Sequence, residues 1–319
     1  MAGIEDLVNN LQKKFGKETV VTEPADVDFC SSGSMGLDLA LGGGYAFGRI
    51  IELRGFESSG KTTLALHAIR EAQKATGKAV VYVDRENALD LNYASSIGVD
   101  VDPSKFILCQ PDTAEECLEV VREVIKSKDI CAVVVDSVAA MFPKCYLDAD
   151  VGDAKMGVLA RLMSAWLPGF VGDMKSNNIL GIFINQYREK IGVFYGDPTT
   201  TPGGKSLGYY ASQIITIAKS GTVGDKGEET AIHVKLKVAK NKVAPPLRTT
   251  EFDIRFGEGI DKLSELITLG TEKEVITRAG AFYRFGNTTL GQGAERARQY
   301  LKEHPDTAKK IEEAILKTI

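Results

Sequence analysis

The segment from Gly55 to Thr63 constrains the fold of this chain more than any other feature. It fits the pattern G-x-x-x-x-G-K-S/T, a loop that binds nucleotide phosphates between a strand and a helix. A strand-like apolar run, 49–54, precedes it, and a helix-like run, 64–70, follows it. The glycines let backbone N–H groups point inward, and the start of the helix adds its dipole. A chance glycine loop would lack this context, so we predict a P-loop.

Within this segment the side chains have separate expected roles. The Lys61 ammonium can reach the β- and γ-phosphates, and the Thr62 hydroxyl can bind Mg²⁺. The residues expected to bind the nucleotide here are Gly55, Glu57, Ser58, Ser59, Gly60, Lys61, Thr62 and Thr63. The chain is therefore predicted to bind a nucleotide together with Mg²⁺.

The composition is that of an ordinary globular protein, with 44% hydrophobic and 26% charged residues among 319. No apolar run approaches the ~20 residues of a membrane span, and the N-terminus does not resemble a signal peptide. The five cysteines form no C-x-x-C pair, so neither a zinc site nor a disulfide framework is supported. Cys109 and Cys131 lie in apolar runs and are predicted to be buried. A reducing cytoplasm is the expected location.

The net charge of −4 argues weakly against nucleic-acid binding, because domains that bind nucleic acids are usually basic. It does not exclude a local basic surface, so the positions of the cations decide the question.

From about residue 31 to 260, strand-like and helix-like runs alternate, which predicts an α/β domain with a doubly wound, mixed sheet. The predicted strands are 49–54, 79–84, 106–110, 132–136, 178–186, 212–218, 230–238 and 250–256. The first five are continuous apolar runs, as in a parallel sheet covered on both faces. The last three alternate and are typical of antiparallel additions at one edge.

The two ends of the chain differ from this central region. Apolar residues at helical spacing predict a helix over 4–15, with Gly16 as its C-cap, and a short strand follows at 19–22. The apolar stripe of this helix needs a partner, either the core of the chain or a neighbouring subunit. Residues after about 262 indicate a small α/β module that ends in a charged helix near 306–319. We therefore expect three parts, 1–30, 31–261 and 262–319.

Three polar residues follow predicted strands and should meet the P-loop, because ligands of such sheets bind beyond the carboxyl ends of the strands. Asp136 ends a buried strand, as does the acid of P-loop ATPases that holds Mg²⁺, usually through a water. Glu86 can act as the general base for an attacking water, or it is a surface acid in a turn. Gln186 can report the γ-phosphate to the following loop, or it is an ordinary polar residue at a strand end.

Two segments are predicted to be functional loops, 148–157 and about 187–204. The second is long for a connection in an α/β domain, and it combines cations with aromatic residues. Such a mixture suits single-stranded nucleic acid, through phosphate contacts and base stacking, although an active-site lid is the alternative. Four lysines line a late strand and its exit, where lysines often protect a solvated edge: Lys235, Lys237, Lys240 and Lys242.

Taken together, these segments resemble the RecA recombinase family over nearly the whole chain. The most specific stretches are 55–63, 86–90 with Tyr93, 135–140, 152–157, 183–193, 199–204 and 238–242. The resemblance implies a RecA-type ATPase core with a mainly parallel mixed sheet, an N-terminal helix–strand arm for polymerisation, and a small C-terminal α/β domain. It implies ATP and Mg²⁺ as cofactors.

The resemblance also implies roles for individual residues around the nucleotide. Glu86 matches the catalytic base and Gln186 the γ-phosphate sensor, while Asp90 and Tyr93 match the adenine contacts. The pair Lys240 and Lys242 matches residues that reach a neighbouring subunit's ATP, as an arginine finger does. The implied DNA-binding residues are Met156, Gly157, Arg161, Arg188, Lys190, Ile191, Gly203, Gly204 and Lys205.

The implied activity is recombination and DNA repair. The protein would polymerise on single-stranded DNA, pair it with a homologous duplex and exchange strands, with DNA-stimulated ATP hydrolysis. A helical filament reconciles this with the acidic net charge, because a small basic patch repeats along the axis. Single-strand-binding proteins, loaders and an SOS repressor whose self-cleavage is stimulated are the further partners that the resemblance suggests.

The chain departs from the family's usual residues at four positions: Phe56, Arg85, Lys205 and Tyr209. Two other functions remain alternatives at this point. A RecA-core paralogue or helicase-like motor would not exchange strands, and a closed ring would lack the N-terminal arm and the 186–204 loop. A small-molecule kinase would need a phosphoacceptor pocket, for which the sequence has no signature.

Overall fold

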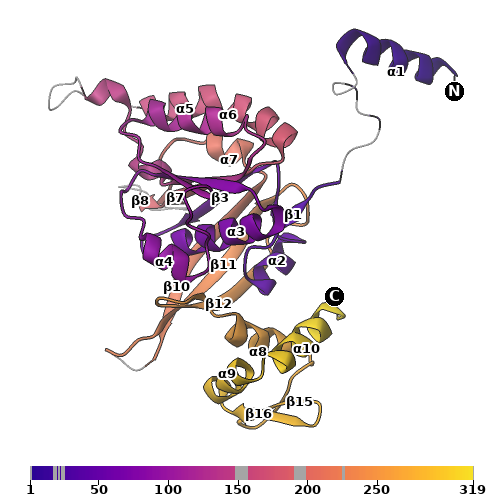
Figure 1. Cartoon of the computed structure of the whole chain (residues 1–319), viewed down its shortest axis with the longest axis vertical. Coiled ribbons are helices and arrows are strands. Elements are labelled where there is room, and N and C mark those ends of the chain that lie inside the picture. The colour runs from indigo at the N-terminus through magenta and orange to yellow at the C-terminus, as the bar shows by residue number, and fades with distance from the viewer. Residues whose placement is uncertain are drawn as a thin grey trace.

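The computed structural model describes residues 2–16, 20, 22, 26–147, 157–189, 199–224 and 227–318. Its centre is a nine-stranded sheet in the order β13-β12-β11-β10-β3-β7-β6-β4-β5 (Figure 1). These strands are β3 (Ile50–Gly55), β4 (Ala79–Asp84), β5 (Phe106–Cys109), β6 (Ile130–Asp136), β7 (Leu180–Gln186), β10 (Gln213–Val223), β11 (Ala231–Asn241), β12 (Thr249–Arg255) and β13 (Gly259–Ile260). The predicted mixed sheet is confirmed.

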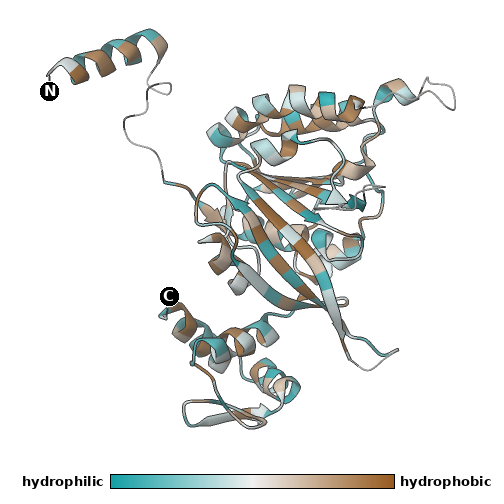
Figure 2. Ribbon diagram, turned by 180° about the vertical axis from the view of Figure 1, so that it is seen from behind, coloured by the Kyte–Doolittle hydropathy of each residue, from teal (hydrophilic) through white to brown (hydrophobic). Residues whose placement is uncertain are grey.

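The strand directions correct one detail of the prediction. β10 pairs in parallel with β3, with Gln213 opposite Ile51, and antiparallel with β11. Only β11, β12 and β13 therefore form the antiparallel edge, although β10 also alternates in sequence. The first part of β10, from Gln213 to Ile217, is largely buried beside β3. Exposed residues begin only where β10 and β11 run on together beyond β3 (Figure 2).

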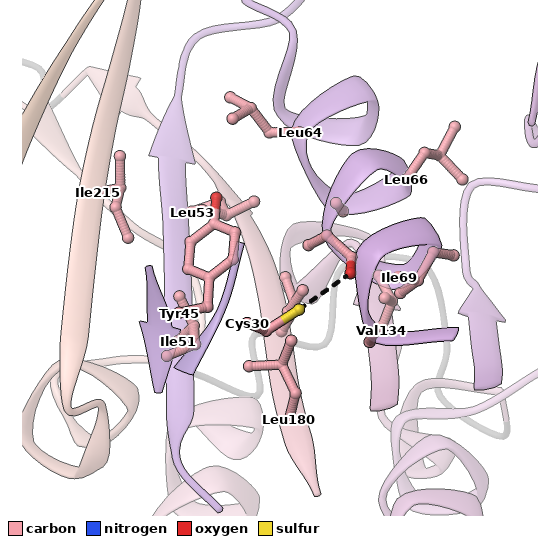
Figure 3. Close-up of a cluster of buried hydrophobic side chains, with 14 of the residues drawn as sticks. Cys30, Tyr45, Ile51, Leu53, Leu64, Leu66, Ile69, Val134, Leu180 and Ile215 are labelled. Carbon is pink, nitrogen blue, oxygen red and sulfur yellow. Dashed lines mark hydrogen bonds between the residues drawn. The ribbon is translucent and has the colours of Figure 1, made fainter. Parts of the chain in front are cut away.

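Helices cover both faces of the sheet (Figure 1). α3 (Lys61–Thr76) and α4 (Leu91–Ser96) lie on one face, and α5 (Ala114–Val124), α6 (Val158–Asn177) and α7 (Ser206–Tyr210) lie on the other. α3 packs Leu64, Leu66 and Ile69 against the buried strands (Figure 3). The remaining elements of the core are β1 (Phe29–Cys30), α2 (Met35–Leu41), β2 (Tyr45–Ala46), β8 (Arg188–Glu189), β9 (Thr199–Thr200) and two 3₁₀ turns (Val138–Ala140 and Lys144–Tyr146).

The predicted N-terminal helix is confirmed as α1 (Ala2–Phe15), with Gly16 directly after it at φ 91°. It lies apart from the core (Figure 1), and its apolar residues Ile4 and Leu7 are exposed. Of the strand predicted at 19–22, only Val20 and Thr22 are described, and both are in bends. Because the apolar stripe of α1 has no cover from the described part of the core, the neighbouring subunit is the better of its two expected partners.

The C-terminal part has its own apolar cluster, which includes Leu290, Leu301 and Ile311. It consists of α8 (Lys262–Glu272), the three-stranded sheet β14 (Thr277–Ala279), β15 (Phe282–Phe285) and β16 (Thr288–Gln292), and the helices α9 (Ala294–Glu303) and α10 (Pro305–Leu316). This is the small α/β module that the sequence predicts.

None of the five cysteines, all of which lie within the described residues, forms a disulfide. Cys131 is buried, as predicted, but Cys109 is only half-buried because it ends β5, the edge strand of the sheet. Within the described residues, no helix has the length and apolar character needed to cross a bilayer.

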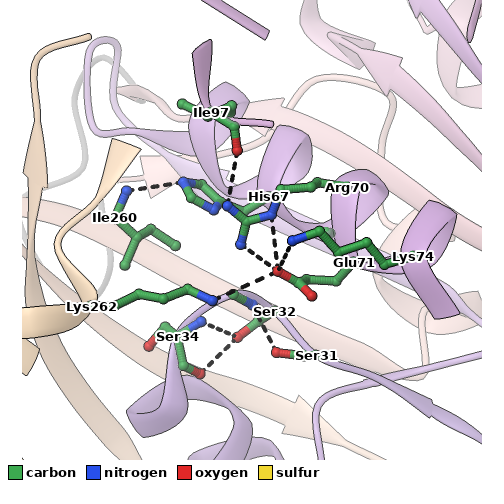
Figure 4. Close-up of polar contacts among 12 residues, drawn as sticks. Ser31, Ser32, Ser34, His67, Arg70, Glu71, Lys74, Ile97, Ile260 and Lys262 are labelled. Carbon is green, nitrogen blue, oxygen red and sulfur yellow. Dashed lines mark hydrogen bonds and ion pairs between the residues drawn. The ribbon is translucent and has the colours of Figure 1, made fainter. Parts of the chain in front are cut away.

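A buried histidine joins the core to the segment that leads into α8 (Figure 4). The Nε2 atom of His67, on α3, accepts a hydrogen bond of 2.9 Å from the Ile260 backbone N–H. Only 1% of His67 is exposed, and burial lowers its pKa to about 3. The ring must therefore be neutral in the folded protein, with the proton on Nδ1.

We expect this histidine to make the protein less stable in mild acid. The unfolded chain binds a proton near pH 6.5 and the folded chain does not, so stability is lost as the pH falls below about 6.5. Between pH 7.5 and 5.5 the loss is about 1.4 kcal/mol for this one group. Urea unfolding of the parent and of His67→Gln at both pH values measures this contribution as the difference between the two proteins. The comparison is needed because burial raises the pKa of Glu265 to about 7, which gives that group the opposite pH dependence in the same range. An equal pH dependence in the variant would contradict this assignment.

Candidate functional site

The P-loop opens into a cavity of about 360 Å³ at the carboxyl ends of β3, β4, β6 and β7. Its lining consists of Glu57, Ser58, Ser59, Gly60, Lys61, Thr62, Thr63, Glu86, Tyr93, Asp136, Gln186, Ile232, Ile254, Arg255, Phe256 and Gly257. The volume is in the range of small-ligand and cofactor sites. The fold therefore brings together the phosphate loop and the three polar residues predicted at strand ends.

The backbone of the loop is shaped for anion binding. Ser58 and Gly60 have positive φ values of 56° and 91°, a geometry in which successive N–H groups can point to one side. The φ of Gly60 favours glycine at this position, and a Cβ atom there would also lie 2.4 Å from Ile254 Cδ1. The Lys61 ammonium donates to the Phe56 carbonyl at 2.6 Å, and burial lowers its pKa. This lysine is folded over the loop, at the place where phosphate oxygens would be held.

Two hydroxyl groups converge on one oxygen of the buried Asp136. Thr62 Oγ1 and Tyr82 OH each donate to Asp136 Oδ2 at 2.7 Å. Burial raises the pKa of Asp136, and these two hydrogen bonds oppose the increase. The close pairing of a P-loop threonine and a carboxylate supplies the hard oxygen ligands that Mg²⁺ prefers, so the residues present fit this ion.

Glu86 is held by two side chains through the same carboxylate oxygen. Ser137 Oγ donates to Glu86 Oε1 at 2.6 Å, and Gln186 Nε2 donates to it at 2.7 Å. The two candidates for base and sensor are therefore in direct contact, although 100 positions separate them in sequence. This contact favours a functional role over the alternatives of a surface acid and an ordinary strand-end amide.

Several expected residues lie elsewhere. Gly55 lies within β3, and Asp90 caps α4 by accepting from the Asn92 and Tyr93 N–H groups. Neither Lys240 nor Lys242 is among the described residues that line the cavity. Lys240 Nζ instead donates to the carbonyls of Gly208 at 2.7 Å and Tyr209 at 3.0 Å. These lysines do not reach the phosphate site of their own chain.

The expected DNA-binding residues are described only in part, because Met156, Lys190 and Ile191 lie outside the described residues. Gly157 caps α6, and Arg161 is exposed on its first turns. Arg188 is exposed on β8, which pairs with β9 through Arg188 and Thr200.

The end of the second loop packs against the helix that follows the first. Gly203 and Gly204 have φ values of 81° and 75°, and a Cβ atom at Gly204 would lie 2.7 Å from Ala160 Cβ on α6. Lys205 is exposed at the start of α7. The described ends of both loops thus meet at one place on the molecule.

Some residues of the site were missed from the sequence. Ser137 could have been found from the sequence, because it directly follows the predicted Asp136. Tyr82 and Arg255 had no such signal, because their places depend on how the strands pack. Arg85 lies next to Glu86 in the sequence, but its Nη1 donates to the Pro111 carbonyl instead. Arg85 and Glu86 lie in a bend that follows the end of β4, and this hydrogen bond holds the guanidinium at Pro111.

Comparison with known proteins identifies the family of this chain. The family model of the RecA N-terminal domain matches residues 2–261, and that of the RecA C-terminal domain matches 264–319. The chain belongs to the RecA family. Protein RecA of Porphyromonas gingivalis is 48% identical over 315 residues, covering 97% of this chain and 92% of that protein. Protein RecA of Syntrophus aciditrophicus is 46% identical over 314 residues, covering 97% and 91%.

The fold has a counterpart among solved structures. The crystal structure of the RadB recombinase matches with a TM-score of 0.55 and 26% identity, over 73% of this chain and 98% of that one. As a member of the RecA family, the chain is a DNA-dependent ATPase that acts in recombination and DNA repair. It binds nucleotide and DNA and forms filaments. The helicase-like and paralogue alternatives are not favoured.

Proposed function

We propose that this RecA-family protein binds ATP with Mg²⁺ in the P-loop cavity and hydrolyses it with Glu86 as the general base. The contact of Ser137 and Gln186 with Glu86 Oε1, facing the Thr62–Asp136 pair across one cavity, is the observation that carries the proposal. The P-loop N–H groups and Lys61 would hold the phosphates, and Thr62 and Asp136 would hold the ion, Asp136 through a water. Bound Mg²⁺ would neutralise charge on the phosphate oxygens.

The proposed chemistry needs a carboxylate that accepts the proton of the attacking water. Ser137 and Gln186 occupy Oε1 and leave Oε2 of Glu86 for this purpose. If Gln186 turns towards the γ-phosphate, Glu86 loses one of its two donors, which would link nucleotide state to the base. Tyr93, whose hydroxyl lies 3.0 Å from Thr63 Oγ1, would contact the adenine together with Asp90.

DNA binding is proposed for the two loops whose described ends meet at Gly204 and Ala160. Arg161, Arg188 and Lys205 are exposed at the described ends of these loops and would contact phosphates. Met156, Gly157, Lys190, Ile191, Gly203 and Gly204 are the other residues proposed to form the DNA-binding site. In a filament, α1 would dock on the next subunit, and Lys240 and Lys242 would reach the neighbour's nucleotide. The repeated patch would form a continuous track for single-stranded DNA.

The proposed setting is the cytoplasm, where the filament would pair its strand with homologous duplex and exchange strands. The same proposal includes stimulation of SOS repressor self-cleavage. It also includes interactions with loader proteins and single-strand-binding proteins. A strand-exchange assay with circular single-stranded and linear duplex DNA tests it directly. Joint molecules that need ATP support the proposal, whereas DNA-stimulated hydrolysis without joint molecules would favour a motor.

The serine beside the base should matter for hydrolysis but not for nucleotide binding. We expect Ser137→Ala to lower kcat about tenfold, because hydrogen bonds to charged groups contribute about 1.5–3 kcal/mol. Ser137→Thr keeps the hydroxyl and is the matched control. DNA-stimulated hydrolysis, measured beside the Kd of a fluorescent ADP analogue, separates the two effects. A large change in Kd with kcat unchanged would argue against this role for Ser137.

A further inference from the structure

We propose that Glu52 is a positioning residue that fixes the segment from Pro202 to Tyr209, which contains the end of the second loop and most of α7, to the strand that carries the P-loop. This inference rests on the proposed function, in which that loop binds DNA. Glu52 lies on β3, three residues before Gly55, and none of its surface is exposed. Its strand neighbours Ile51 and Leu53 are apolar and equally buried. A carboxylate in such a place is costly unless it is paired.

Two side chains satisfy this carboxylate. Arg54 Nη2 is 2.7 Å from Glu52 Oε2, and Asn185 Nδ2 donates to Glu52 Oε1 at 3.2 Å. Arg54 follows on the same strand, whereas Asn185 belongs to the neighbouring strand β7, where it lies opposite Arg54. The three side chains lie on the face of the sheet that α7 covers, since α7 contacts β3.

Asn185 extends the network to the loop and to the proposed sensor. Its Nδ2 also donates to the Pro202 carbonyl at 3.2 Å, and its Oδ1 accepts from the Gln186 N–H at 3.1 Å. One amide therefore connects the buried carboxylate, the residue that touches Glu86, and the returning end of the loop. Because Gly55 pairs with Gln186 in the sheet, the P-loop strand and the sensor strand are held in register at this level.

Arg54 anchors the helix that follows the loop. A Cβ atom at Gly208 would lie 2.7 Å from Arg54 Nη2, so α7 rests directly on the guanidinium. From the other side, Lys240 Nζ donates to the carbonyl of the same Gly208. The segment 202–209 is thus tied to β3 through Glu52 and to β11 through Lys240. Loss of the Glu52 carboxylate would release the Arg54 side chain. It would thereby weaken the contact of Arg54 with Gly208 and the hydrogen bond of Asn185 with Pro202.

The consequence is a fixed connection between the nucleotide side and the DNA side of the subunit. A displacement of the Gln186 backbone would move Asn185, and with it the hydrogen bond to Pro202. Glu52 would keep the loop end in one position in the absence of ligands, which is what a defined response to DNA requires. Glu52 is not among the described residues that line the cavity, and its side chain contacts Arg54 and Asn185, through which it would act.

The direct test is hydrogen exchange of the peptide 202–210 in the full chain without nucleotide or DNA. We expect Glu52→Gln to speed its exchange at least tenfold. The double variant Glu52→Gln with Arg54→Met removes the charge pair without leaving a buried cation, and it should show the same effect if the single variant folds poorly. Glu71→Gln is the matched control, because it also breaks an ion pair of the core, with Arg70, and it should leave this peptide unchanged.

The functional arm compares hydrolysis with and without single-stranded DNA. We expect the stimulation to fall about tenfold in both Glu52 variants, with basal hydrolysis and nucleotide Kd within twofold of the parent. Unchanged exchange and unchanged stimulation would overturn the inference. If the parent protein shows no stimulation by DNA, the proposed function fails, while the exchange experiment still decides whether Glu52 anchors the loop.

Discussion

Replacing Glu86 by glutamine is expected to reduce DNA-stimulated ATP hydrolysis by about 10²- to 10⁴-fold, the usual contribution of a general base. The amide can still accept from Ser137, so the cavity should keep its shape, but it cannot take a proton from water. Nucleotide binding should therefore persist, as should filaments on single-stranded DNA. Hydrolysis with and without DNA, together with electron microscopy of filaments, measures both parts.

Glu57→Gln is the matched control for this experiment. Glu57 lines the same cavity, yet it makes neither of the contacts that hold Glu86. We expect its kcat to stay within about threefold of the parent, with any loss confined to nucleotide Kd, because Glu57 is expected to bind the nucleotide and not to accept the proton of the water. Equal losses in the two variants would mean that negative charge in the cavity matters, and not a base at position 86. DNA-independent hydrolysis in the parent would point to another kind of P-loop ATPase.

The largest effect is expected when Lys240 and Lys242 are both replaced by alanine. Cations supplied by a neighbour stabilise the transition state of phosphoryl transfer by about 10³- to 10⁵-fold. Neither lysine lines the described cavity of its own chain, so the loss should appear only in filaments. Nucleotide affinity of the dispersed protein should not change. Hydrolysis at saturating DNA, and nucleotide binding without DNA, are the two measurements.

The control pair lies on the same strand. Lys235 and Lys237 are exposed on β11, and their replacement by alanine removes the same charge. If these lysines only protect a solvated edge, hydrolysis should stay within about threefold of the parent. A comparable loss in both pairs would indicate a general effect of charge on DNA binding, and it would remove the reason to place Lys240 and Lys242 in a neighbour's site.

Much of the core could be predicted because its strands are buried on both faces. β4 coincides with the predicted 79–84, and the P-loop, Glu86, Asp136 and Gln186 do meet in one cavity. The sequence pattern did not predict the direction in which β10 pairs with β3. Its alternating pattern is typical of an antiparallel edge, but the first part of the strand is buried beside β3. Alternation reports exposure of one face and not the direction of the neighbouring strand.

The side-chain contacts within the site depend on which strands are neighbours in the sheet, and local sequence patterns do not determine this. Tyr82 reaches Asp136 because β4 and β6 are neighbours in a sheet whose order differs from the order of the chain. Arg255 enters the cavity from the end of β12, three strands away from β3. Arg85 is next to Glu86 in the sequence, yet its guanidinium donates to the Pro111 carbonyl, which no local pattern indicates. The network of Glu52, Asn185 and Arg54 likewise joins residues that no motif connects.

The central claim is that hydrolysis takes place between subunits of a filament. Mixing two inactive variants tests it most directly: Glu86→Gln, which lacks the base, and the double variant Lys240→Ala with Lys242→Ala, which lacks the cations. In a random filament about one interface in four combines an intact Glu86 with intact lysines from its neighbour. The account predicts that the mixture recovers DNA-stimulated hydrolysis to about that fraction of the parent rate. A mixture as inactive as its two components, although both variants assemble together on DNA, would contradict it.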